Sequence, residues 1–183
     1  MRFGIIKERK NPPDRRVVFS PLKLKELKEK FSEAIIKVEP SAIRIFSDDA
    51  YQKNGIEVTE NMTDCDVLFG VKEVPIENLI PNKKYFFFSH TIKKQPYNRK
   101  LIQAVLSKNI ELYDHETIVK ENGMRLIGFG RYAGIVGAYN GLLAYGLRTK
   151  SFELKPAYKC DDIEELKQQL ETLKFDKPIN IAL

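Results

Sequence analysis

The 183-residue sequence is poor in the residues that cross-link small proteins. Its two cysteines, Cys65 and Cys160, stand far apart and form neither a disulfide framework nor the close spacing of a cysteine metal site. The thiols are therefore expected to be reduced, and we predict a cytoplasmic location. A chain of this length can bury a core of its own without such cross-links.

Long hydrophobic runs are also missing. The longest apolar stretches, such as residues 85–88, have the length of a strand and are far shorter than the roughly 20 residues that cross a bilayer. The apolar run near the N-terminus is too short for the hydrophobic region of a signal peptide. The sequence therefore predicts no membrane span and no secretory leader.

Positive charge is present in excess, with a net charge of +6, and residues 1–30 carry that whole excess. Three explanations are open: a nucleic-acid patch, an anion pocket made by a few arginines, or a solvated helix face. Lysines 23, 25, 28 and 30 favour the last of these, because they lie on one polar helical segment. No interleaved aromatics or nucleic-acid motif accompany the charge, so we predict no nucleic-acid partner.

Short apolar runs alternate with helical patterns along the first part of the chain. Ser20-Pro21 and Ser47 are expected to cap two helices, and a third is expected over residues 99–108. The alternation predicts an α/β fold, with a mainly parallel sheet flanked by helices in a flavodoxin- or Rossmann-like arrangement. Strands are predicted at residues 3–7, 34–38, 43–46, 66–70, 85–88 and 110–113.

A different pattern begins at Tyr132. Residues 132–148 carry small side chains at spacings of three and four, which let another backbone approach closely, and they predict a long helix buried against the partner half of the protein. Close packing there would offset the roughly 1 kcal/mol by which each glycine weakens a helix relative to alanine. A second helix is predicted over residues 163–173, so the α/β domain is expected to have a C-terminal helical extension.

Ligands of open parallel sheets bind outside the carboxyl ends of the strands, which directs attention to the four segments that follow predicted strands: residues 8–16, 72–73, 89–90 and 114–116. A lysine at such a place can act as a base, although a Lys-Glu pair such as Lys72-Glu73 is more often a solvated loop. His90 ends an aromatic strand, where it is suited to general acid/base work or to a structural hydrogen bond. For His115 the structural role is favoured, because neighbouring carboxylates compete for the catalytic one.

Two further segments carry weaker signals. Arg16 precedes the first helix, where a guanidinium can bind a carboxylate with two hydrogen bonds, and Arg15 is the alternative. Residues 128–133 fit a loose dinucleotide-binding pattern, but the strand expected before them is short and lies in a hairpin-like segment. We therefore assign these glycines to turn and packing roles.

Taken in order, these motifs resemble the N-terminal domain of the family that contains alanine dehydrogenase, the transhydrogenase alpha subunit and lysine-forming saccharopine dehydrogenase. Lys7-Glu8 and RVVFSP correspond to the first motif of that family, and its GVKE is present at residues 70–73. SHTIKKQPYN, YDHE and GFGRYAG resemble saccharopine dehydrogenase and the lysine–oxoglutarate reductase domain in particular. The resemblance covers most of the chain.

The resemblance implies a role for each of several residues. Lys72 resembles the catalytic lysine, the base for a secondary amine, and His90 resembles the acid/base that assists imine hydrolysis. Glu73 and Glu116 resemble the acidic residues that tune this lysine and histidine.

Three arginines are implied to bind substrate. Arg16 resembles the arginine that holds a substrate carboxylate, and Arg125 and Arg131 are further candidate contacts. The implied reaction converts saccharopine, NAD(P) and water into lysine and 2-oxoglutarate, or runs in reverse. The alternatives are an alanine dehydrogenase-like enzyme of the same family and a non-catalytic carboxylate-binding module.

The resemblance also implies a domain plan. Residues 1–131 would be the substrate-binding catalytic domain, residues 132–176 inter-domain helices, and residues 177–183 the start of a dinucleotide-binding domain whose glycine turn the chain does not include. NAD or NADP is expected on that missing domain, with no cofactor in this chain, so the chain alone is expected to be inactive. The expected partners are a small amino acid or 2-oxo acid and the missing domain, with oligomerisation left open.

Overall fold

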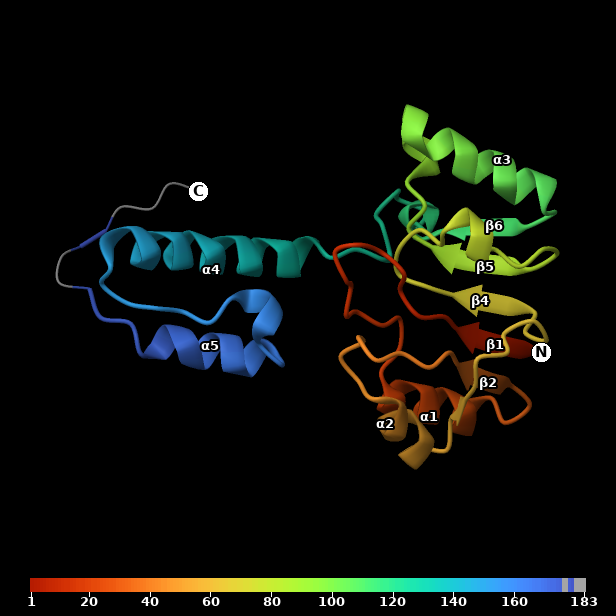
Figure 1. The fold of residues 1–183 in the computed structure, drawn as a ribbon, viewed down its shortest axis with the longest axis horizontal. Coiled ribbons are helices and arrows are strands. Elements are labelled where there is room, and N and C mark those ends of the chain that lie inside the picture. The colour runs from red at the N-terminus through yellow and green to blue at the C-terminus, as the bar shows by residue number, and fades with distance from the viewer. Residues whose placement is uncertain (176–177, 180–183) are drawn as a thin grey trace. The chain divides into compact units, whose positions relative to one another are not determined.

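The computed structural model describes residues 1–175 and 178–179 (Figure 1). Contacts divide the chain into two compact units, Met1–Gly128 and Phe129–Leu183. The expected start of a dinucleotide-binding domain, residues 177–183, lies outside the described residues except for Pro178 and Ile179. Among the helices that the structure describes, none is long and apolar enough to cross a membrane.

The first unit is built on a six-stranded sheet in which all neighbouring strands are parallel, in the order β3-β2-β1-β4-β5-β6. The strand order reverses direction between β1 and β4, which is the topological switch point of the sheet. The α/β fold with a parallel sheet is therefore confirmed. The strands are β1 (Arg2–Ile5), β2 (Ile35–Val38), β3 (Glu57–Val58), β4 (Val67–Phe69), β5 (Lys84–Phe87) and β6 (Glu111–Asp114).

Three helices flank this sheet, and local sequence explains where two of them begin. At the start of α1 (Pro21–Lys30) the Ser20 hydroxyl accepts a hydrogen bond from the Lys23 amide. Ser47 caps α2 (Asp48–Lys53) in the same way. Side-chain caps of this kind satisfy amides that a helix leaves unpaired at its first turn. The third helix is α3 (Arg99–Ser107).

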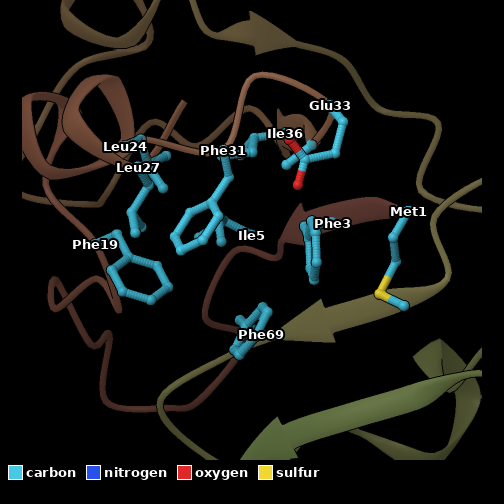
Figure 2. A pocket seen from close by; sticks show the side chains of 11 residues that line it. Met1, Phe3, Ile5, Phe19, Leu24, Leu27, Phe31, Glu33, Ile36 and Phe69 are labelled. Carbon is cyan, nitrogen blue, oxygen red and sulfur yellow. The ribbon is translucent and has the colours of Figure 1, made fainter. Parts of the chain in front are cut away.

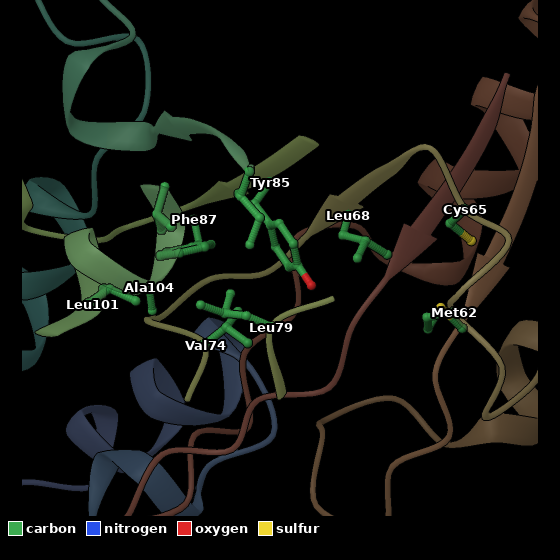
Figure 3. Packing of buried hydrophobic residues seen from close by; sticks show 11 residues of the cluster. Met62, Cys65, Leu68, Val74, Leu79, Tyr85, Phe87, Leu101 and Ala104 are labelled. Atoms are coloured by element: carbon green, nitrogen blue, oxygen red, sulfur yellow. The ribbon is translucent and has the colours of Figure 1, made fainter. Parts of the chain in front are cut away.

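Each face of the sheet carries its own hydrophobic core. On one face Leu68, Tyr85 and Phe87 pack with Leu101 of α3 and its neighbours (Figure 3). The opposite face packs mainly against α1 and α2, through a cluster of Ile5, Leu24, Ile36, Val38, Tyr51 and Ile56. Burial on both faces is the normal condition of a parallel sheet and explains its near-continuous apolar strands.

An apolar cavity of about 470 Å³ lies on the α1 face (Figure 2). Side chains from α1, β1 and β4 line it, among them Leu24, Phe3 and Phe69. From there an aromatic row continues across the sheet, because Phe69 stacks on Phe86 and Phe86 stacks on Tyr113. None of the residues expected to carry chemistry lines this cavity.

The structure departs from the predicted elements at three places. Residues 43–46 are not a strand, because the Arg44 guanidinium donates to backbone carbonyls of Glu39 and Phe46 and holds the segment in bends. The two-residue strand β3 was not predicted, since it is too short to show a period. The expected hairpin before residue 128 is reduced to one isolated bridge, between Val119 and Arg125.

The second unit contains the two predicted C-terminal helices, α4 (Gly130–Thr149) and α5 (Ile163–Glu171). Tyr139 of α4 is buried, and its hydroxyl donates to the Lys155 carbonyl at 2.6 Å. Glycines 134, 137 and 141 face open space, since a methyl group added at any of them would have no described atom within 4 Å. Packing of this helix against a partner half therefore stays a prediction.

Candidate active site at the carboxyl edge of the sheet

Polar side chains gather where the strands of the first unit end. Glu8 lies shortly after the end of β1, Lys72-Glu73 after β4, and Ser89-His90 after β5. Asp114–Glu116 lie at the end of β6. Since the strands are parallel, their carboxyl ends lie on one edge of the sheet, where ligands of such folds bind. The four predicted segments are therefore neighbours in space.

Glu116 is the centre of a charge cluster on this edge. Its side chain is only 4% exposed, yet His90 Nδ1 lies 2.9 Å from one carboxylate oxygen. Lys93 Nζ and Arg125 Nη1 lie 3.3 Å and 3.1 Å from the other. The hydrogen bond from His90 is the main reason that the pKa of Glu116 falls below its ordinary value. Glu116 is thus held as a carboxylate that orients the His90 ring.

His90 lies between two carboxylates. Its second ring nitrogen, Nε2, is 3.9 Å from Glu73 Oε1, and the other Glu73 oxygen is 3.9 Å from Lys10 Nζ. The sequence correctly grouped His90 with Glu73 and Glu116 as neighbours at the strand ends. With Nδ1 donating to Glu116, Nε2 is the ring atom left to exchange a proton.

The His90 backbone is held in a left-handed conformation, with φ of 57°. This region is unfavourable for a residue other than glycine and persists only where surrounding contacts impose it. Asn98 provides one such contact, because its buried Nδ2 donates to the His90 carbonyl at 3.0 Å. The strain is therefore located at the residue that points into the site.

Ser89 and Asp114 lie in two of the predicted segments, but the sequence assigned neither of them a role in the site. The fully buried Ser89 hydroxyl donates to Asp114, and the other Asp114 oxygen accepts the Glu116 amide at 2.8 Å. Asp114 therefore links the segment that carries His90 to the one that carries Glu116. The sequence signal that could have identified Ser89 is its position, as a polar residue directly after an aromatic strand.

Lys72 stands at the switch point between β1 and β4. Its amide donates to Glu8 Oε2 at 2.9 Å, and the Val71 amide donates to Glu8 Oε1 at 2.7 Å. Burial raises the pKa of Glu8 above its ordinary value, against the opposing effect of these two hydrogen bonds. Glu8 was recognised in the sequence only as part of a motif, because a contact across 64 residues leaves no local signal.

Arg16 is engaged by a carboxylate of its own chain. Its Nε lies 2.9 Å from Asp14 Oδ1, and a terminal nitrogen pairs with Asp14 Oδ2. This pairing lowers the pKa of Asp14 and raises that of Arg16. The Arg16 side chain is 41% exposed, so an external carboxylate can reach it by sharing or displacing Asp14.

His115 has the environment of a structural histidine. It is buried, and its Nε2 lies 3.1 Å from the Gly70 carbonyl, to which it can donate. Its Nδ1 has no hydrogen-bond partner among the described residues. Burial lowers its pKa below the ordinary value of 6.5, which keeps the ring neutral.

Arg131 belongs to the second unit, so its role at this site stays a prediction. In the loose dinucleotide pattern of residues 128–133, Gly130 begins α4, and the segment before it forms turns and one isolated bridge. Within the described ranges, no group of three or more His, Cys, Asp or Glu side chains could hold a metal ion.

Comparison with known proteins shows the family and the fold of this chain. Residues 4–136 match the family model described as "Alanine dehydrogenase/PNT, N-terminal domain". The chain belongs to this family. Its sheet resembles that of a solved L-alanine dehydrogenase, with a TM-score of 0.59 over 81% of this chain and 40% of that one. At 21% identity, this likeness concerns the alanine dehydrogenase/PNT fold alone.

Curated relatives are considerably longer than this chain. Alpha-aminoadipic semialdehyde synthase of Arabidopsis thaliana is 37% identical over 149 residues, which is 79% of this chain and 14% of the relative. Saccharopine dehydrogenase [NAD(+), L-lysine-forming] of Candida glabrata is 29% identical over 143 residues, 75% of this chain and 38% of the relative. The chain therefore spans less than two fifths of either protein.

Proposed function

We propose that this chain is the substrate-binding and catalytic half of an NAD(P)-dependent amino-acid dehydrogenase that interconverts saccharopine with lysine and 2-oxoglutarate. The observation that carries the proposal is the grouping of His90, Glu73 and Glu116 at the same sheet edge as Lys72. Relatives whose names include saccharopine dehydrogenase support this substrate. The general reaction class would be oxidation at a CH–NH bond.

The chemistry requires two proton-transfer groups and several cations. Saccharopine has a secondary amine and three carboxylates, so its oxidation needs a base at the amine and arginines at the carboxylates. Lys72 would take the amine proton, while the nicotinamide, held on a domain outside this chain, would accept the hydride. Arg16 and Arg125 would bind carboxylates, with Arg131 as a further contact.

His90 would serve the hydrolytic half of the reaction. After oxidation, water must add to the substrate imine and lose a proton. Glu116 accepts from Nδ1 and so leaves Nε2 as the basic atom, which would receive this proton. Glu73, near Nε2, would stabilise the imidazolium that results.

The proposal is tested by calorimetric titration of the chain with saccharopine, 2-oxoglutarate and NADH in parallel. We expect both carboxylate ligands to bind, and Arg16→Ala to weaken binding by about 10-fold or more through loss of a charged hydrogen-bond pair. Arg2→Ala is the matched control, because Arg2 also pairs with an aspartate but lies at the opposite end of β1.

Unchanged ligand affinity in Arg16→Ala would remove that arginine from the site. Tight NADH binding by this chain would contradict the proposal that the cofactor is held on a separate domain. Residues 128–133 would then be the candidate cofactor site. Ligand binding by this chain, without turnover even after a dinucleotide-binding half is supplied, would favour the non-catalytic carboxylate-binding module instead.

A further inference from the structure

The backbone pairing between β1 and β4 ends just before the site. Its last backbone hydrogen bond joins the Ile6 amide to the Phe69 carbonyl at 2.9 Å. Beyond this point the two chains separate, as they must at a topological switch point, where a crevice opens between them. The Val71 and Lys72 amides therefore point toward β1 without backbone carbonyls opposite them.

Glu8 occupies that position with its side chain. One carboxylate oxygen accepts the Val71 amide at 2.7 Å and the other accepts the Lys72 amide at 2.9 Å. Hydrogen bonds from amides to a charged acceptor are stronger than those between neutral groups. The carboxylate thus continues the pairing of β1 with β4 for two more residues, as far as Lys72.

Residues that follow other strands also contact the backbone of residues 70–72. The Phe88 amide donates to the Val71 carbonyl at 3.0 Å, and His115 Nε2 contacts the Gly70 carbonyl. Among the ion pairs of the described residues, none joins Glu8 to the Lys72 amine. The contact that the structure shows between Glu8 and Lys72 is therefore made through the backbone amide.

We propose that Glu8 is a positioning residue, which fixes the backbone of Lys72 so that its amine is presented to the substrate at the switch point. This inference rests on the proposed function, in which Lys72 is the base. In this role Glu8 is not a substrate ligand, because both of its carboxylate oxygens accept backbone amides. Its substitution should therefore lower turnover far more than it changes the Michaelis constant.

Glu8→Gln is the variant that tests this role. The side chain keeps its size, but one of the two acceptors becomes an amide that faces another N–H group, so one hydrogen bond is lost. Asp66→Asn is the matched control, because Asp66 accepts the Arg2 amide at 2.7 Å between the same two strands at their opposite ends. Both variants neutralise a carboxylate that accepts a backbone amide between these strands, but the asparagine oxygen at position 66 can still accept the Arg2 amide, since only one Asp66 oxygen is used.

The first readout uses the chain itself. In a pH titration followed by amide NMR, the Val71 and Lys72 resonances should shift together as Glu8 protonates, and Glu8→Gln should abolish that step. Asp66→Asn should leave it intact and remove only the step seen at Arg2. The inference would be overturned if the Val71 and Lys72 resonances showed the same pH dependence in Glu8→Gln as in the unaltered chain.

The second readout uses the complete enzyme, in which this domain works together with its dinucleotide-binding half. Misplacement of a reacting group by about 1 Å can lower turnover by roughly 100-fold. We expect kcat to fall by about 10- to 100-fold in Glu8→Gln with KM changed by less than about 3-fold, and both to be preserved in Asp66→Asn.

Lys72→Met separates the two ways in which this experiment can fail. Loss of turnover in Lys72→Met with normal turnover in Glu8→Gln would overturn the positioning role alone. Normal turnover in Lys72→Met would overturn the assignment of Lys72 as the base, and the proposed function would fail with it. An equal loss of kcat in Asp66→Asn would mean that Glu8 acts only by stabilising the pairing of β1 with β4, and the positioning role would be overturned.

Discussion

Glu116 illustrates how single residues at this edge depend on one another. A histidine, a lysine and an arginine share one buried carboxylate, and removal of that carboxylate leaves the two charged side chains uncompensated. The lowered pKa of Glu116 means that its ion pairs contribute stability above the ordinary carboxyl range and that this contribution is lost as pH falls through the lowered pKa. The His90 ring thus stays oriented throughout the neutral range.

His115 gives a testable pH dependence at the same scale. Its depressed pKa means that the unfolded chain takes up a proton more readily than the folded one, so stability falls as pH drops below about 6.5. His115→Gln retains a donor for the Gly70 carbonyl and cannot titrate. Urea unfolding at about pH 7 and about pH 5.5 should show a smaller acid-induced loss of unfolding free energy in the variant. Equal losses in both proteins would mean that His115 does not titrate as described.

The helix α4 contains glycines in two different environments. At Gly141 an added methyl group would meet open space, whereas at Gly146 it would lie 2.5 Å from the Phe152 ring and 2.6 Å from its carbonyl oxygen. The first glycine is therefore conformationally unfavourable with no compensating contact in the described residues. The second permits a close approach of the chain that follows the helix.

These environments predict opposite effects of alanine. Gly141→Ala should raise the free energy of unfolding of the second unit by up to about 1 kcal/mol, from helix propensity alone. Gly146→Ala should lower it by about 1–3 kcal/mol, because backbone atoms must move. Thermal unfolding followed by circular dichroism measures both. If a partner half packs on the exposed glycines, Gly141→Ala should also weaken association with that half.

At the scale of the molecule, the candidate site belongs to the first unit. Both hydrophobic clusters lie within Met1–Gly128, and so do all the proposed catalytic residues. A unit with a core on each face of its sheet is expected to fold without the remainder of the chain.

A fragment of residues 1–128 tests that independence. It should unfold in a single cooperative urea transition, and it should keep the amide pattern of the Glu8 contacts. Leu68→Ala, at a fully buried position, should lower its unfolding free energy by about 2–5 kcal/mol. A gradual transition, or one insensitive to Leu68→Ala, would show that the fold depends on the second unit.

Local signals in the sequence determined most of the first unit. Short apolar runs marked five of the six strands, and Ser20 and Ser47 marked two helix starts. Parallel topology then followed from the alternation of strands and helices. Because parallel strands end on one edge, the sequence also predicted that Lys72, His90 and Glu116 lie on the same edge.

Only the tertiary structure decided the contacts among these side chains. The bond from Glu8 to Lys72 joins residues 64 apart, and that from His90 to Glu116 joins residues 26 apart, so no local period encodes either. The bends at residues 43–46 likewise depend on the Arg44 side chain, which competes with strand pairing for the backbone. The pattern of apolar residues indicates which face of an element is buried. The position of a charged group depends instead on strand order and register, and these are determined by contacts between distant parts of the chain.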